Sequence, residues 1–101
     1  MRITSSVAES RLGDVTEERQ FWCQDGKVIK SLQELELALK EMTEEAFRYH
    51  SNEAKSDFSN WVRDVIGDEK LSRDLQKSTT RAQAAKSLAD RIAWLKGKLM
   101  T

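Results

Sequence analysis

The apolar and polar residues from residue 31 to the C-terminus follow the pattern of amphipathic helices. Apolar residues recur every three or four positions, which places them on one side of a helix that turns about every 3.6 residues. The stripes consist of Leu32, Leu35, Leu39 and Met42; Phe58, Trp61, Val62 and Val65; Leu71 and Leu75; and Ala85, Leu88, Ile92, Leu95 and Leu99. The sequence therefore predicts a mainly α protein, a small bundle of four to five helices.

Two capping boxes mark the beginnings of the first and last stripes. Ser31 and Glu34 stand three residues apart, and so do Thr80 and Gln83. In a capping box the hydroxyl accepts a hydrogen bond from a free amide of the first turn, and the acidic or amide side chain reaches back. Helices are therefore expected to begin at residues 31 and 80.

Further helix ends can be located between these two boxes. Acidic residues after Thr43 favour the start of a short helix that runs to His50, because negative charge stabilises a helix N-terminus. Asp57 and Asp68 are expected to be N-caps of the next two helices. Gly67 is expected to end the first of these two, since glycine accepts the left-handed conformation at a helix end.

A different pattern precedes the helices. Residues 21–24 and 27–30 are rich in aromatic and β-branched side chains, and Asp25-Gly26 lies between them. An Asp-Gly pair between two such runs predicts a β-hairpin with a type I′ turn, in which both central residues have positive φ. A lone hairpin is only marginally stable in water, so it is expected to lie on the helices.

Residues 1–19 contain few apolar residues. Ile3, Val7, Leu12 and Val15 are spaced among serine, arginine and glutamate, a pattern that buries little surface. The sequence therefore predicts a flexible N-terminal arm at 1–19 and a single helical domain at 20–101.

Composition supports the helical prediction and limits the function. The chain has 101 residues, four glycines and no proline, and its 17 basic residues balance its 17 acidic ones. This balance argues against nucleic acid as a partner. The charges are nevertheless uneven, because residues 81–101 carry five basic residues against Asp90 alone. Nucleic-acid binding by the last helix therefore stays an alternative, with Arg81, Lys86, Arg91, Lys96 and Lys98 as the contacts.

Other features favour a cytoplasmic protein without a membrane partner. Cys23 is the single cysteine, so no internal disulfide forms. The first ten residues lack the apolar core of a signal peptide, and no stretch approaches the roughly 18 apolar residues that span a bilayer.

Catalytic and metal-binding patterns are weak, so we predict no enzyme, no cofactor and no metal. The four glycines are isolated from one another, which excludes a glycine-rich phosphate loop. Cys23 and His50 have the chemistry of a nucleophile and a base, but no pattern brings them together. His50, Glu53 and Asp57 would share a face of an unbroken helix and suit a weak divalent metal site. Because Ser51 and Asn52 favour turns, we expect His50 and Asn52 to bond backbone groups instead.

Two apolar residues fall outside the stripes. Leu37 lies off its stripe, and Trp94 lies opposite the seam of the last helix, near Arg91 and Lys98. An aromatic side chain with basic neighbours is a typical anchor for a protein partner. We therefore predict Leu37, Arg91, Trp94 and Lys98 as partner-binding residues. The seam from Ala85 to Leu99 spans about two heptads and is expected to pack within the chain.

The sequence also resembles a known family. The motifs that carry the resemblance are Phe21-Trp22, Asp25-Gly26, Ser31-Leu32-Gln33-Glu34-Leu35, Phe47-Arg48-Tyr49-His50, and Asp57-Phe58 through Asp68. In this order they are similar to a family of short, uncharacterised, largely archaeal helical domains with the patterns F-x-Y-H and D-F-x-x-W-[VI]-x-D-V-x-G-D. The match covers about residues 21–75, and Ser56 stands where the family has Asn. The resemblance implies a small stand-alone module and supplies neither a reaction nor a catalytic residue.

Three functions follow from these patterns, in this order. The first is a non-enzymatic module that docks a protein partner or a second copy of itself. The second is nucleic-acid binding by the basic last helix. The third is a metal or catalytic site around His50, with Cys23, Glu53 or Asp57 as the second group.

Overall fold

The computed structural model describes residues 3–100, most of which are helical. Its elements are α1 (Ser5–Leu12), η1 (Glu17–Arg19), β1 (Phe21–Trp22), β2 (Val28–Ile29), α2 (Leu32–Glu41), α3 (Glu44–His50), α4 (Asp57–Trp61), η2 (Val62–Ile66), α5 (Glu69–Lys77) and α6 (Arg81–Leu99). The predicted fold class, mainly α with a short N-terminal hairpin, is confirmed. Among residues 3–100 the α-helices number six, because α1 adds to the five that the stripes and caps indicate.

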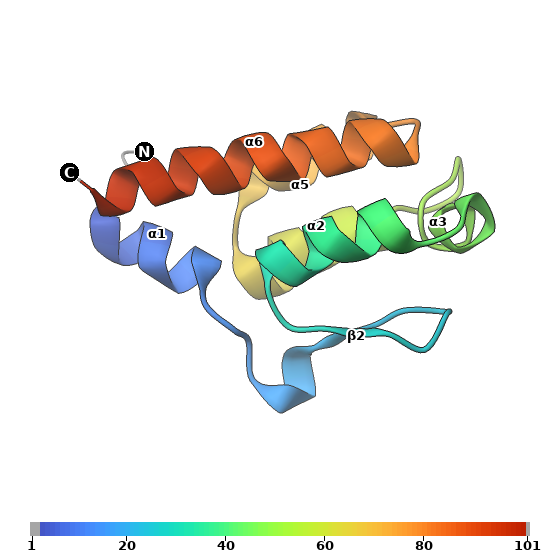
Figure 1. The fold of residues 1–101 in the computed structure, drawn as a ribbon, viewed down its shortest axis with the longest axis horizontal. Helices are drawn as coiled ribbons and strands as arrows, with labels where there is room; N and C mark the ends of the chain where they lie inside the picture. Colours follow the sequence, from blue (N-terminus) through green and yellow to red (C-terminus); the bar gives the residue numbers. More distant parts are fainter. Residues whose placement is uncertain (1–2, 101) are drawn as a thin grey trace.

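Helix α6 packs against three other helices. It contacts α1, α2 and α5, and Figure 1 shows it along one side of the molecule with α1 and α2 beneath it. Leu88 and Leu95 of the seam are fully buried, and Ile92 is nearly so. The seam therefore packs within the chain from Ala85 to Leu95, as expected, whereas Leu99 at its end is 42% exposed.

Helix α1 belongs to the same core. Ala8 is fully buried, and Ile3, Leu12 and Val15 pack against the core from its edge. Helix α1 packs against α6 and α2, and Ala8 is its buried residue. Residues 5–12 of the predicted arm thus share the core of the predicted domain at 20–101, while the mobility of the arm stays a prediction.

The hairpin lies on the helices, as predicted, and it packs there against aromatic side chains. Phe21 pairs with Ile29 across the two strands, and its ring lies 5.2 Å from the ring of Phe58 and 6.0 Å from that of Trp61. Trp22 pairs with Val28, and both side chains point away from the core. The hairpin therefore has one buried face and one exposed face.

The turn of the hairpin differs from the predicted type. Gly26 has a φ of 92°, but Asp25 does not have a positive φ, so the type I′ prediction is wrong. The Gly26 amide donates to the Cys23 carbonyl, and the Lys27 amide donates to Asp25 Oδ1. Because the aspartate side chain closes the turn, only the glycine takes the left-handed conformation.

Most predicted caps are confirmed. Side-chain oxygens of Ser31, Thr43, Asp68 and Thr80 each accept the backbone amide three residues later. Asp57 was predicted as a cap and is not one, because Ser56 precedes α4 and Asp57 Oδ2 lies against His50 and Lys55. The contact of Asp57 with His50 thus replaces the predicted N-cap hydrogen bond.

Figure 1 also shows that most helices are short. Within residues 3–100, none combines the length and the apolar character needed to cross a membrane.

Gly67 and Gly97 offer a matched test of helix ends. Gly67 ends the π-helical turn η2 with a φ of 85°, whereas Gly97 lies inside α6 with open space where a Cβ would project. We expect Gly67→Ala to destabilise the protein by about 1 kcal/mol or more, because an alanine is strained at positive φ. Gly97→Ala should stabilise it by up to about 1 kcal/mol, because alanine has the higher helix propensity. Urea unfolding of both variants measures the two changes, and equal effects would contradict this account.

Candidate functional site

Arg91, one of the predicted partner-binding residues, lies in a buried ion pair. Its Nε donates to Asp68 Oδ2 at 2.8 Å, and Arg11 Nη1 lies 3.4 Å from the same oxygen. Asp68 is fully buried, and its Oδ1 accepts the Leu71 amide at the start of α5. A buried carboxylate needs such partners, since burying an unpaired charge is costly. Asp68 therefore joins α5 to α6 through Arg91 and to α1 through Arg11, and Arg91 is only 9% exposed.

Trp94 lies next to this ion pair on the flank of α6 that faces α5. Its ring is 4.3 Å from the guanidinium of Arg91 and 4.8 Å from the ammonium of Lys98. It is 41% exposed and lines a depression of about 400 Å³ with Lys70 and Asp74. Cation–π contacts of this kind stabilise exposed rings by about 0.5–1 kcal/mol. Trp94 is thus half-exposed and already contacts the two basic residues predicted beside it.

Leu37 lies elsewhere, on the side of α2 that faces the hairpin. It is 58% exposed and lines a groove of about 330 Å³ between β2 and α2 together with Val28 and Ala38. Val28 pairs with Trp22, which is 68% exposed. We call Trp22, Val28 and Leu37 the hairpin–α2 surface. The four predicted partner-binding residues therefore divide between two places and do not form one site.

The outer edge of β2 adds backbone groups to this surface. In an antiparallel pair, hydrogen-bonded and non-hydrogen-bonded residue pairs alternate. The Cys23 amide donates to the Lys27 carbonyl, so the next pair, Trp22 and Val28, is the non-hydrogen-bonded kind. The N–H and C=O of Val28 therefore point outward from the hairpin. The open edge is short, because the Lys30 carbonyl already accepts the Val15 amide.

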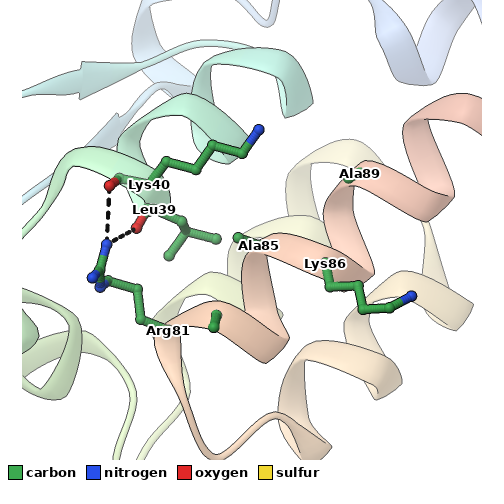
Figure 2. A pocket seen from close by; sticks show the side chains of 7 residues that line it. Leu39, Lys40, Arg81, Ala85, Lys86 and Ala89 are labelled. Atoms are coloured by element: carbon green, nitrogen blue, oxygen red, sulfur yellow. Dashed lines mark hydrogen bonds between the residues drawn. The ribbon is translucent and has the colours of Figure 1, made fainter.

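The basic residues of α6 are largely engaged within the chain. Figure 2 shows Arg81 reaching from α6 to the end of α2, where its Nη1 donates to the Leu39 and Lys40 carbonyls at 3.0 Å each. Its Nε donates to Glu44 at 3.1 Å. Arginine at a helix C-terminus stabilises the last carbonyls, so Arg81 caps α2.

The groove between α2 and α6 in Figure 2 is lined by Leu39, Lys40, Arg81, Ala82, Ala85, Lys86 and Ala89, and has a volume of about 370 Å³. Lys86 pairs with Asp90 and Lys40 with Glu36, each at 2.8 Å. These acidic partners neutralise the basic residues at the rim. The groove therefore offers no excess positive charge to a phosphate backbone.

His50 lies at the junction of α3, α4 and the hairpin. The Gln24 amide donates to its Nε2 at 2.9 Å, and its Nδ1 lies 2.9 Å from Asp57 Oδ2. Because Nε2 accepts, the proton of the neutral ring is on Nδ1 and is donated to Asp57. The predicted backbone bonds of His50 and Asn52 are confirmed, since Asn52 Nδ2 donates to the Arg48 carbonyl and Asn52 Oδ1 accepts two later amides.

The structure brings His50 and Asp57 together but leaves Glu53 exposed on the following loop. Among residues 3–100, no three His, Cys, Asp or Glu side chains are grouped in a way that could hold a metal ion. Both ring nitrogens of His50 are occupied by neighbours within the chain, so a metal or a substrate would have to displace one of them.

Cys23 is buried next to the turn of the hairpin. Burial and, to a smaller extent, the nearby charge of Asp25 raise the pKa of its thiol, the charge of Lys27 lowers it, and the resulting pKa is about 11. The thiolate is the reactive form of cysteine, so a raised pKa suppresses nucleophilic chemistry. The arrangement therefore lacks the activated thiol that a Cys23–His50 pair would need.

Comparisons of the chain with protein-family models, with curated proteins and with solved structures find no match in any of the three. The resemblance to the archaeal helical domains thus stays a prediction.

Two features of this region were missed from the sequence. The first is the exposure of Trp22. Side chains alternate between the two faces of a strand, so an inward Phe21 implies an outward Trp22, and the Phe21-Trp22 motif already contained this signal. The Asp68–Arg91 pair has no local signal, since the two residues are 23 positions apart. Only the packing of α5 against α6 brings them together.

The Asp68–Arg91 pair can be tested by removing the charge. We expect Asp68→Asn to destabilise the protein by about 3 kcal/mol or more, because the guanidinium of Arg91 is then buried without its counter-charge. Asp90→Asn removes the exposed pair with Lys86 and should cost less than about 1 kcal/mol. Urea unfolding measures both, and similar costs for the two variants would contradict the structural role of Arg91.

The state of the Cys23 thiol can be tested by alkylation. At pH 8 we expect iodoacetamide to modify the folded chain roughly a hundredfold more slowly than the same chain unfolded in urea, because the thiolate fraction is small. The rate should rise with pH until about 11, the raised pKa of this thiol. Mass spectrometry of timed samples gives both rates. A folded chain that reacts as fast as the unfolded one would restore Cys23 as a candidate nucleophile.

Proposed function

We propose that this chain is a non-enzymatic protein-interaction module that binds an extended segment of a partner protein at the hairpin–α2 surface. The observation that carries the proposal is the groove between β2 and α2, where Val28 lies beside Leu37, which is 58% exposed. Trp22, the strand partner of Val28, is itself 68% exposed. Exposed large apolar side chains that gather in one place are typical of interaction sites. An exposed tryptophan beside such a groove can serve as a binding anchor.

The choice of an extended segment rests on the backbone of Val28. Its outward N–H and C=O can pair with another strand, in the mode by which a peptide adds to an open sheet edge. The edge is only a few residues long, so main-chain bonds alone would bind weakly. A partner side chain in the groove between β2 and α2 would supply the rest of the affinity, with Leu37 and Ala38 as its walls.

The alternatives have less support. Nucleic-acid binding by α6 would compete with the bonds that Arg81, Lys86 and Arg91 make within the chain. Catalysis at His50 would need a ring nitrogen that is already bonded, and Cys23 is protonated at neutral pH. A buried, unpaired thiol also fits the reducing cytoplasm in which we place the protein.

A peptide selection tests the proposal. We would select binders from a displayed library of random linear peptides with the full chain as bait, and then measure each dissociation constant by calorimetry. We expect Leu37→Glu to weaken binding on the order of tenfold or more, because it places a charge against an apolar contact. Val28→Pro should also weaken binding, since proline lacks the outward N–H.

The matched control is Met100→Glu, which makes the same kind of change at a residue that is 88% exposed at the other end of the chain. It should leave binding unchanged. Peptides that bind all variants alike, or a library that yields no binder, would contradict the proposal. Sedimentation of the chain alone tests whether the surface instead binds a second copy of the chain. A dimer that dissociates in the Leu37→Glu variant would show self-association and would contradict binding of a partner segment.

A further inference from the structure

His50 ties the turn of the hairpin to the helices by a bond that depends on its protonation state. The ring is buried between the hairpin, α3 and the start of α4. On one side its Nε2 accepts the Gln24 amide, and on the other its Nδ1 donates to Asp57. One imidazole therefore connects three segments of the chain.

The groups around the ring are known from each segment packed against it. The rings of Phe21, Tyr49 and Phe58 have centroids 5.0–5.3 Å from that of His50. The charged neighbours are Asp57, in direct contact, and Lys55, whose ammonium lies 3.1 Å from the same Asp57 oxygen. On the hairpin, the titratable residues that flank Gln24 are Cys23, whose thiol has a pKa of about 11, and Asp25, which closes the turn.

Protonation changes only one of the two bonds. A proton taken up from solvent must bind Nε2, because Nδ1 already carries one, and both nitrogens of an imidazolium are donors. The new N–H then faces the Gln24 N–H. Two donors cannot form a hydrogen bond, so the contact at this distance becomes unfavourable. The bond to Asp57 persists and becomes charge-assisted. Protonation of His50 thus removes the tie to the hairpin and keeps the tie to α4.

We propose that His50 is a pH-sensitive latch that holds the turn of the hairpin and, through it, the Trp22 and Val28 part of the hairpin–α2 surface. Phe21 and Ile29 stay in the core when the latch opens, because Phe21 also packs against Phe58 and Trp61, and Ile29 is almost fully buried. Acidification therefore loosens the turn without releasing the strands. Regulation of partner binding by the latch rests on the proposed function, whereas the opening of the latch with pH does not.

NMR of the labelled full chain between pH 8 and pH 5 tests the latch, since histidine side chains change charge in this interval. The readouts are the imidazole nitrogen shifts of His50 and the hydrogen-exchange protection factor of the Gln24 amide. We expect protection to fall about fivefold or more as His50 becomes protonated, because one hydrogen bond is lost. The Leu35 amide, inside α2, should keep its protection.

Two variants separate the latch from general acid effects. His50→Gln offers an oxygen to Gln24 and an N–H to Asp57 but does not titrate here, so its Gln24 protection should not change with pH. Asp57→Asn keeps an acceptor for Nδ1–H and removes the carboxylate charge, and in this variant the loss of Gln24 protection should still follow the imidazole nitrogen shifts of His50.

The outcomes are distinct from those of the proposed function. Unchanged Gln24 protection in a chain whose His50 shifts show protonation would overturn the latch, and so would a His50 that stays neutral down to pH 5. The selected peptides are then titrated at both pH values. Peptide binding that weakens at pH 5 in the natural chain but not in His50→Gln supports regulation. Peptide affinity that is the same at both pH values although the latch opens would overturn regulation. A lack of any peptide binding at pH 8 would overturn the proposed function alone, since the NMR readouts do not involve a partner.

Discussion

The carboxylate of Asp68 is the constraint on which the rest of the structure depends. It is fully buried, and a buried charge is stable only when charged and hydrogen-bonding partners surround it. One oxygen begins α5 by accepting the Leu71 amide, and the other contacts Arg91 of α6 and Arg11 of α1. Three helices are therefore positioned by one side chain. Their approach is fixed by hydrogen-bond geometry as well as by apolar packing.

This arrangement explains why the basic last helix is not a free cationic surface. Arg91 neutralises Asp68 in the interior, and Arg81, ten residues earlier, binds the last carbonyls of α2 and the Glu44 carboxylate. These two arginines hold α6 to its neighbours at separate points along its length. Leu88, between them, and Leu95, beyond Arg91, are fully buried in the core. In an isolated helix these positive charges could attract a partner, but here they form ion pairs and hydrogen bonds within the chain. The uneven charge along the sequence is therefore largely balanced in three dimensions.

What the sequence predicted correctly was local. The Ser31 and Thr80 caps and the inward face of α6 depend on residues within one helical turn, so their patterns were sufficient. The predictions that were wrong depended on distant residues or on competing side chains: Asp57 turned from its helix to His50, and Asp25 closed a different turn from the one its dipeptide favours. The candidate site divided in the same way. The off-stripe position of Leu37 was visible in the sequence, but the meeting of α2 with the hairpin, which sets Leu37 beside Val28, was not.

The hairpin is the element in which fold and proposed function meet. Two strands of two residues can bury one face only, and Phe21 and Ile29 occupy that face. Trp22 and Val28 must then point outward, and full burial of a large apolar side chain would be worth about 1.5–3 kcal/mol. Because both side chains are partly exposed, part of this burial is missing in the chain alone, and a partner that covers the surface would supply it. Because His50 holds the turn from the other side, the position of the exposed pair depends on one internal hydrogen bond as well as on the core.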